Sequence, residues 1–117
     1  MHWSGMRSPS EQITEVVTSW PGVEAGYGRR GEWAFTVGRR EIGHLHGDHA
    51  AHFAFPKDVW AELSAAGRIT DHPVFPGRIG PAARRINDQA DVEDVIVLMR
   101  LIYDRIAARR ALAQDAA

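Results

Sequence analysis

Apolar residues recur at helical spacing near the N-terminus of the chain. Ser8 can cap a helix there, with Pro9 at the first helical position and Glu11 placed to close a capping box. Pro21-Gly22 would end that helix. Its core-facing stripe consists of Ile13, Val16, Val17 and Trp20.

Two further segments have helical spacing. One helix is predicted over about 56–66, with Gly67 following its C-terminus. A long final helix is predicted from Asp91, as N-cap, to about Arg110. Its core stripe consists of Val95, Met99, Ile102 and Ile106. Val97 and Leu101 fall outside the stripe and could seed a homodimer.

Between the helices the period changes to two, which is typical of β-strands. Residues 23–55 alternate, with turn signals at Gly38-Arg39 and Gly47-Asp48, and 82–86 can form a last strand after an irregular segment at 69–81. The order is helix, four strands, helix, strand, helix. We therefore expect an α+β fold with an antiparallel sheet of about five strands and helices on one face.

Two-residue turns at Gly38-Arg39 and Gly47-Asp48 would fix the register of this sheet. Trp33 would then lie opposite His44, and His44 opposite Ala51. One face collects Trp33, Phe35, Val37, Ile42, His44, Ala51, Phe53 and Phe55, and Leu45 is the misfit on the other face. Because most of these residues are apolar, this is the expected core face.

Four of the six histidines fall within residues 44–52. In the expected register His46 and His49 form a cross-strand pair next to His44, while His52 points to the other face and into solvent. Three neutral imidazoles suit zinc or another borderline divalent metal. The alternatives are a core histidine at position 44, or a site where an imidazole moves a proton for a small anion or polar substrate.

Other residues add candidates for binding. Asp48 is either a ligand or part of its own turn. Trp33 lies beside His44 in the expected register. Of Arg84 and Arg85 one must point inward, where it could meet an anion or a carboxylate, and a structural ion pair with a carboxylate is favoured. The segment 69–81, with His72 and Phe75, either covers a pocket or is a fixed crossover.

Composition sets limits on function. The chain has 117 residues, a length typical of one domain, with 1–7 and 111–117 expected to fray. The net charge of −1 makes nucleic acid an unexpected partner. The chain has no cysteine, which excludes Cys-ligated zinc, and no apolar run approaches a membrane span. With no signal peptide recognised, a cytoplasmic location is expected.

Several short motifs resemble the short bacterial proteins of the luciferase family. The main one is 40–48, Arg-Glu-Ile-Gly-His-Leu-His-Gly-Asp, and the similarity extends from about Trp20 to Arg105. Further motifs are Phe55-Pro56, Ala66-Gly67-Arg68, His72-Pro73 and Leu101-Ile102-Tyr103-Asp104-Arg105. The chain is too short for the (β/α)₈ type of luciferase. The order of its elements is also similar to that of the MmcQ/YjbR-like domains, an α+β fold associated with DNA binding.

These patterns lead to one expected function and one alternative. The first is a small-molecule- or anion-binding domain with a His-lined site on the sheet, which leaves open whether it catalyses a reaction. The second is a protein- or nucleic-acid-binding module without catalysis. A pocket protein should gather its histidines around one cavity, whereas an interaction module should present a flat apolar or basic surface.

Overall fold

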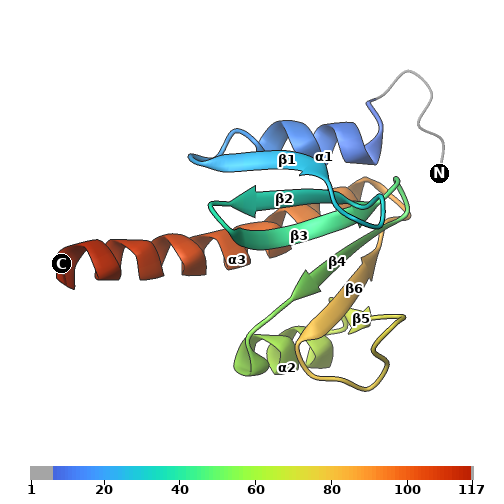
Figure 1. Ribbon diagram of the computed structural model, residues 1–117. Helices are drawn as coiled ribbons and strands as arrows, with labels where there is room; N and C mark the ends of the chain where they lie inside the picture. Colours follow the sequence, from blue (N-terminus) through green and yellow to red (C-terminus); the bar gives the residue numbers. More distant parts are fainter. Residues whose placement is uncertain (1–6, 117) are drawn as a thin grey trace.

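The computed structural model describes residues 7–116 and confirms an α+β fold. Its sheet is antiparallel, with strand order β1-β2-β3-β4-β6-β5 (Figure 1). The elements are α1 (Pro9–Val17), β1 (Val23–Tyr27), β2 (Trp33–Val37), β3 (Arg40–His46), β4 (Ala50–Ala54), α2 (Lys57–Ala65), β5 (Thr70–Asp71), β6 (Pro81–Arg85) and α3 (Gln89–Ala116). The short strand β5 lies in the segment for which the sequence predicts no regular structure. Among the residues described, none of the helices combines the length and apolarity that a membrane crossing requires.

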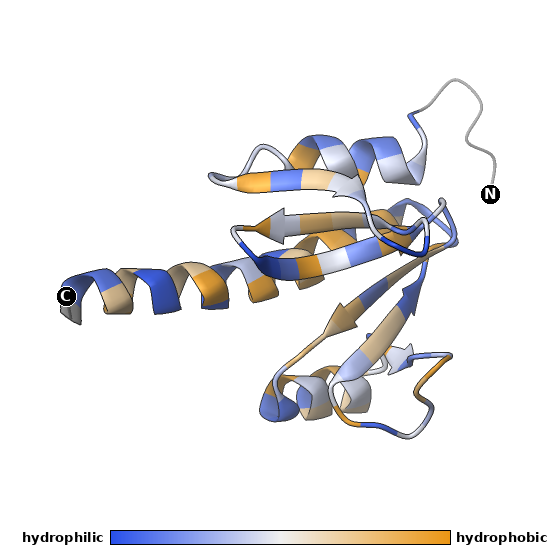
Figure 2. Ribbon diagram, in the orientation of Figure 1, coloured by the Kyte–Doolittle hydropathy of each residue, from blue (hydrophilic) through white to orange (hydrophobic). Residues whose placement is uncertain are grey.

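The core lies between the sheet and the helices. In Figure 1, α3 passes behind the strands, and α1 packs against α3. The fully buried side chains come from α1, the strands and the first half of α3, and the largest are Phe35, Ile13, Ile42, Leu45, Leu98 and Met99. In Figure 2 the strands carry much of the hydrophobic colour, and the helices alternate hydrophobic and hydrophilic bands.

The ends of the helices follow from local capping. Ser8 and Glu11 form the expected capping box at the start of α1. At α3 the Asp88 side chain accepts a hydrogen bond from the Asp91 amide (2.9 Å), so the cap is Asp88 and not Asp91. The helix also continues beyond Arg110, through residues expected to fray, because its alanine-rich end favours helix and contains no breaker.

The turn at Gly38-Arg39 has the predicted two residues, with Val37 opposite Arg40. The register then shifts between Phe35 and Thr36, so that Phe35 lies opposite Gly43 and Ile42 is the extra residue of a β-bulge. The predicted pairing of Phe35 with Ile42 is therefore wrong. The bulge lets both Ile42 and Leu45 be buried, which an unbroken strand would forbid because they are three positions apart.

The second turn contains three residues, 47–49, rather than two. His46 lies opposite Ala50, and Leu45 lies opposite Ala51. Together the bulge and the longer turn keep Ala51 and Phe53 on the core face, as predicted, but move Leu45 onto that face and His44 away from it. The misfit at Leu45 is thereby resolved.

Candidate functional site

Four histidines gather on the sheet face that points away from the core. His44 and His46 come from β3, His52 from β4, and His72 directly follows β5. The ring centroids of His46 and His52 are 4.2 Å apart, as are those of His52 and His72, while His44 is 5.0 Å from His46 and 5.2 Å from His52. We refer to these four residues as the histidine cluster.

His52 is the centre of the cluster and its most enclosed member. Only 8% of the residue is exposed, and its Nδ1 is buried without a hydrogen-bond partner. Burial, followed by the proximity of His46, His72 and His44, lowers the pKa of His52 from 6.5 to about 4. Burial, followed by the proximity of His44 and His46, also lowers the pKa of His72. The centre of the site therefore holds a neutral imidazole near pH 7, and its buried nitrogen has an unmet hydrogen-bonding requirement.

The partners of the outer histidines restrict their orientation. Nδ1 of His44 lies 3.0 Å from Oε2 of Glu41. On the other side of the cluster, the amide of Val74 donates to Nδ1 of His72 (3.1 Å), and the ring of Phe75 lies 5.2 Å from the ring of His72. The cluster is thus bordered by a carboxylate on β3 and by the loop that follows β5.

The predicted set of His44, His46 and His49 does not come together. The expected pairing of His46 with His49 is wrong, because His49 is an exposed residue of the three-residue turn. His52, expected in solvent, is buried on the same face as His44 and His46. The one indication of a register shift in the sequence was Leu45, an apolar residue that the expected register placed on the polar face. Nothing in the sequence pattern indicated that His72 would join them.

Asp48 and Arg84, which were also predicted as site residues, contact the helices instead of the cluster. The carboxylate of Asp48 accepts a hydrogen bond from the Ser10 amide (2.9 Å), which ties the turn to the start of α1. Arg84 points toward α3 and pairs with Asp91 and Asp94, each at 2.7 Å, which confirms the ion-pair interpretation.

Arg85 takes the opposite direction from its neighbour Arg84. It is exposed and lies opposite Ala50, which in turn lies opposite His46. Residues directly opposite one another in neighbouring strands share a face. Arg85 is therefore on the face of the histidine cluster, at the end of the His46 row.

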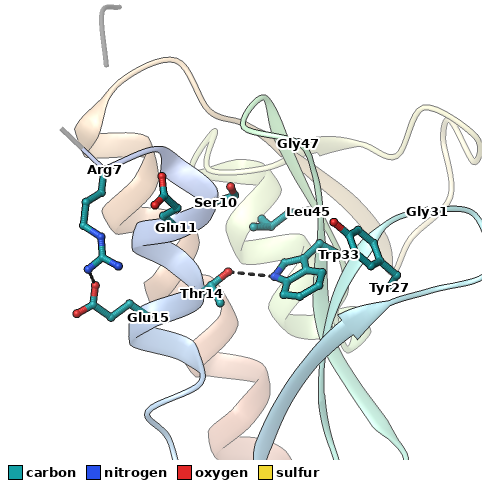
Figure 3. Close-up of a pocket in the computed structure, with 10 residues that line it drawn as sticks. All are labelled: Arg7, Ser10, Glu11, Thr14, Glu15, Tyr27, Gly31, Trp33, Leu45 and Gly47. Carbon is teal, nitrogen blue, oxygen red and sulfur yellow. Dashed lines mark hydrogen bonds and ion pairs between the residues drawn. The ribbon is translucent and has the colours of Figure 1, made fainter. Parts of the chain in front are cut away.

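Trp33 lies in a separate place, on the helix side of the sheet. Its Nε1 donates to Thr14 Oγ1 (3.0 Å), and its ring stands edge-on to Tyr27 with centroids 4.8 Å apart. Both side chains line a cavity of about 670 Å³ between α1 and the strands (Figure 3). Leu45 also lines the cavity, as do Arg7 and Glu15, which form an ion pair. This cavity is a second candidate for ligand binding.

Comparison with known families distinguishes the two candidate sites, the histidine cluster and the cavity beside α1. The sequence pattern of the Luciferase domain matches residues 39–102, more than half of the 117-residue chain. The chain belongs to the luciferase-domain family. The segment that defines this luciferase-domain protein contains all four members of the histidine cluster, whereas the cavity is lined mostly by residues that precede it.

Other comparisons give no match. No curated protein and no solved structure resembles the chain closely enough to be reported. The likeness to the MmcQ/YjbR-like domains stays a prediction. The open antiparallel sheet does exclude the (β/α)₈ barrel of the flavin-dependent luciferases for this domain.

Proposed function

We propose that this luciferase-domain protein binds a small polar molecule at the histidine cluster on the open face of its sheet. The observation that carries the proposal is the buried Nδ1 of His52, which has no hydrogen-bond partner among the described residues. Leaving such an atom unsatisfied costs about 1–3 kcal/mol. A ligand that offers a hydrogen bond or a coordination bond to this atom would recover that cost.

The chemistry of the cluster favours a neutral hydrogen-bond donor over an anion. Anion binding by imidazoles requires them to be charged, and burial holds His52 in its neutral form. Arg85 offers a positive charge at the end of the His46 row for any acidic substituent. Imidazoles are also the side chains that most often transfer protons in enzymes, so a bound hydroxyl would meet groups able to take its proton.

Two further facts support a small-molecule site here. The segment that matches the Luciferase domain, residues 39–102, contains the whole cluster. His44 and His72 are half-buried and His46 is exposed, so the rings can be reached from solvent while His52 lies beneath them. Sites of this kind combine an enclosed centre with a few convergent polar groups.

The proposal can be tested by NMR of the histidine rings in protein treated with a chelator. Phenol serves as a neutral hydroxyl donor and inorganic phosphate as an anion, each added at pH 7.5. We expect phenol to shift the ring nitrogens of His52 and its neighbours in a saturable way and phosphate to leave them unchanged, with His49 as the internal reference. The His52→Ala variant should lose the response, and His49→Ala should keep it.

Two outcomes would refute this assignment. If phenol shifts the signals of Trp33 and Tyr27 and not those of the cluster, the binding site is the cavity beneath α1. If phosphate binds the cluster and phenol does not, the site recognises anions.

A role in protein binding is the second candidate, because one observation favours it. Three apolar residues of the loop after β5 are exposed beside His72: Val74 (62%), Phe75 (40%) and Ile79 (53%). They give this loop its hydrophobic colour in Figure 2. Exposed apolar groups of this kind are typical of contact surfaces. Under this alternative the Phe75→Ser variant would lose a protein partner while its histidine ring signals respond to phenol as in the parent.

A further inference from the structure

We propose that His44, His52 and His72 form a site for one divalent metal ion of the zinc type. Each of the three residues offers one ring nitrogen, and these atoms lie within 4.8 Å of one another. The proposal rests on the site described under Proposed function, but it concerns a different ligand and can fail independently of it.

The distances are close to those of a metal centre. Zinc–nitrogen bonds of about 2.0–2.1 Å in a tetrahedral arrangement place two nitrogens about 3.4 Å apart. The three ring nitrogens need to approach one another by at most about 1.4 Å, which rotation of the partly exposed rings can supply. His52 is buried on β4, between β3 and β6, while His44 and His72 are half-buried and each is held by one hydrogen bond, so they have more room to move than His52.

A second, independent observation is the unpartnered Nδ1 of His52. The residue is more than nine-tenths buried, and three other imidazoles surround it. A metal ion uses a lone pair on a neutral imidazole and needs no hydrogen-bond donor there. Coordination would therefore satisfy a buried side-chain nitrogen that has no hydrogen-bond partner among residues 7–116.

Glu41 supplies the support that metal-binding histidines usually have. Its carboxylate lies 3.0 Å from Nδ1 of His44 and holds the proton on that nitrogen. Nε2 then carries the free lone pair and is the atom available to a metal. A carboxylate behind a coordinating histidine fixes the ring and raises its basicity, and such partners matter about 10–100-fold in affinity.

His72 requires one rearrangement. Its Nδ1 accepts a hydrogen bond from the Val74 amide, which places the proton on Nε2. To coordinate through Nε2, His72 must move this proton to Nδ1 and thereby give up the hydrogen bond from Val74. The residues involved lie at the start of an exposed loop, so metal binding should shift the loop and leave the strands in place.

Three imidazoles leave a fourth coordination position open. His46 is the fourth member of the cluster but is exposed, and its ring lies 4.2 Å from that of His52. A three-histidine zinc site with an open position holds water or a substrate there. Neutral nitrogen ligands suit Zn²⁺, Co²⁺, Ni²⁺ and Cu²⁺, and the absence of cysteine excludes a thiolate site.

The test is a titration of untagged, chelator-treated protein with Co²⁺, whose four-coordinate complexes absorb strongly in the visible range. We expect one equivalent to bind and Zn²⁺ to displace it. The His72→Ala and His52→Ala variants should each weaken Co²⁺ binding by about 100-fold or more, and Glu41→Gln by about 10-fold. The matched control His49→Ala should change the affinity by less than about 2-fold, because His49 lies in the exposed turn.

Circular dichroism of each variant without metal checks that the variant is folded. If His52→Ala does not fold, the test relies on His72→Ala, because His72 lies at the start of an exposed loop. The inference is wrong if no Co²⁺ binds at one equivalent, or if His72→Ala and His49→Ala bind it equally well. The phenol response measured in chelator distinguishes the two proposals. If that response is present and Co²⁺ does not bind, the metal site is refuted and the small-molecule site stands. If Co²⁺ binds as expected and phenol has no effect on the cluster, the small-molecule site is refuted and the metal site stands.

Discussion

Replacing Arg84 by Met should destabilise the protein far more than the same replacement at the neighbouring Arg85. Arg84 lies on the core side of β6 and donates to Asp91, to Asp94 and to the carbonyl oxygen of Arg68, at 2.7, 2.7 and 2.8 Å. About four-fifths of each of the three charged side chains is buried, with exposures of 20% for Arg84, 17% for Asp91 and 22% for Asp94. Methionine keeps the volume of the stem and removes only the guanidinium.

The expected loss follows from this burial. Removing one partner of a fully buried ion pair costs about 3–5 kcal/mol, because the other charge is left uncompensated. The aspartates are partly exposed and Asp94 keeps its pair with Arg68, so the expected loss is about 2–3 kcal/mol. For a domain of this size that corresponds to a fall in melting temperature of roughly 10 °C. Arg85 is exposed and makes no ion pair among the residues described, so Arg85→Met should change stability by less than about 0.5 kcal/mol.

Urea denaturation at several pH values adds a check on the mechanism. Burial raises the pKa of Asp91, but the hydrogen bond from Arg84 and the backbone amides of Asn87 and Asp88 lower it further, to a net value below 3.8. A carboxyl with a depressed pKa stabilises the fold above its unfolded pKa and loses that contribution as the pH falls through the folded value. The difference between parent and Arg84→Met should therefore be largest near pH 7 and shrink below pH 3.8. Equal losses in Arg84→Met and Arg85→Met, or a difference independent of pH, would refute the reasoning.

Three further predictions concern other contacts. Asp48→Ala removes the acceptor of the Ser10 amide and should lower the free energy of unfolding, measured by urea denaturation, by about 1 kcal/mol. An unchanged free energy would show that this bond between the turn and α1 does not stabilise the fold. A Cβ at Gly43 would lie 3.2–3.3 Å from atoms of β4 and α3, so Gly43→Ala should lower the free energy of unfolding by about 1 kcal/mol or more. Gly26→Ala, where the added Cβ meets no atom within 4 Å, is the matched control. Equal melting temperatures for the two variants would contradict this account of the packing. Leu101 is 37% exposed on α3, and if α3 mediates a dimer, light scattering should show a parent dimer that Leu101→Glu converts to monomer; a monomeric parent rules the dimer out.

The sequence predicted the fold well where local chemistry determines it. The capping box of α1, the turn at Gly38-Arg39 and the burial of the α3 stripe each depend on a few neighbouring residues and are confirmed. The bulge at Ile42 depends on a competition between two apolar residues of opposite parity, Ile42 and Leu45. Burying both side chains contributes more to the free energy of folding than the strand loses by leaving one residue unpaired.

The candidate site was harder to predict for the same reason. His44 and His46 were assigned to the wrong face by a single register step, and His49 lost its pairing because the turn has one more residue than expected. His72 is close to His52 only because the two-residue strand β5 pairs with β6. A strand of only two residues is too short to show the alternation by which strands are predicted from a sequence.

The bulge has a consequence for how this domain can change in length. Because β3 contains one extra residue, deleting Ile42 or Gly43 would restore a regular strand and turn the imidazoles of His44 and His46 toward Met99, with Leu45 exposed in their place. A deletion in the loop after β5 would only shorten an exposed connection. Insertions and deletions among relatives should therefore accumulate in that loop and be absent between Glu41 and His44. A relative that does lack one residue there should also lack the histidines that follow it.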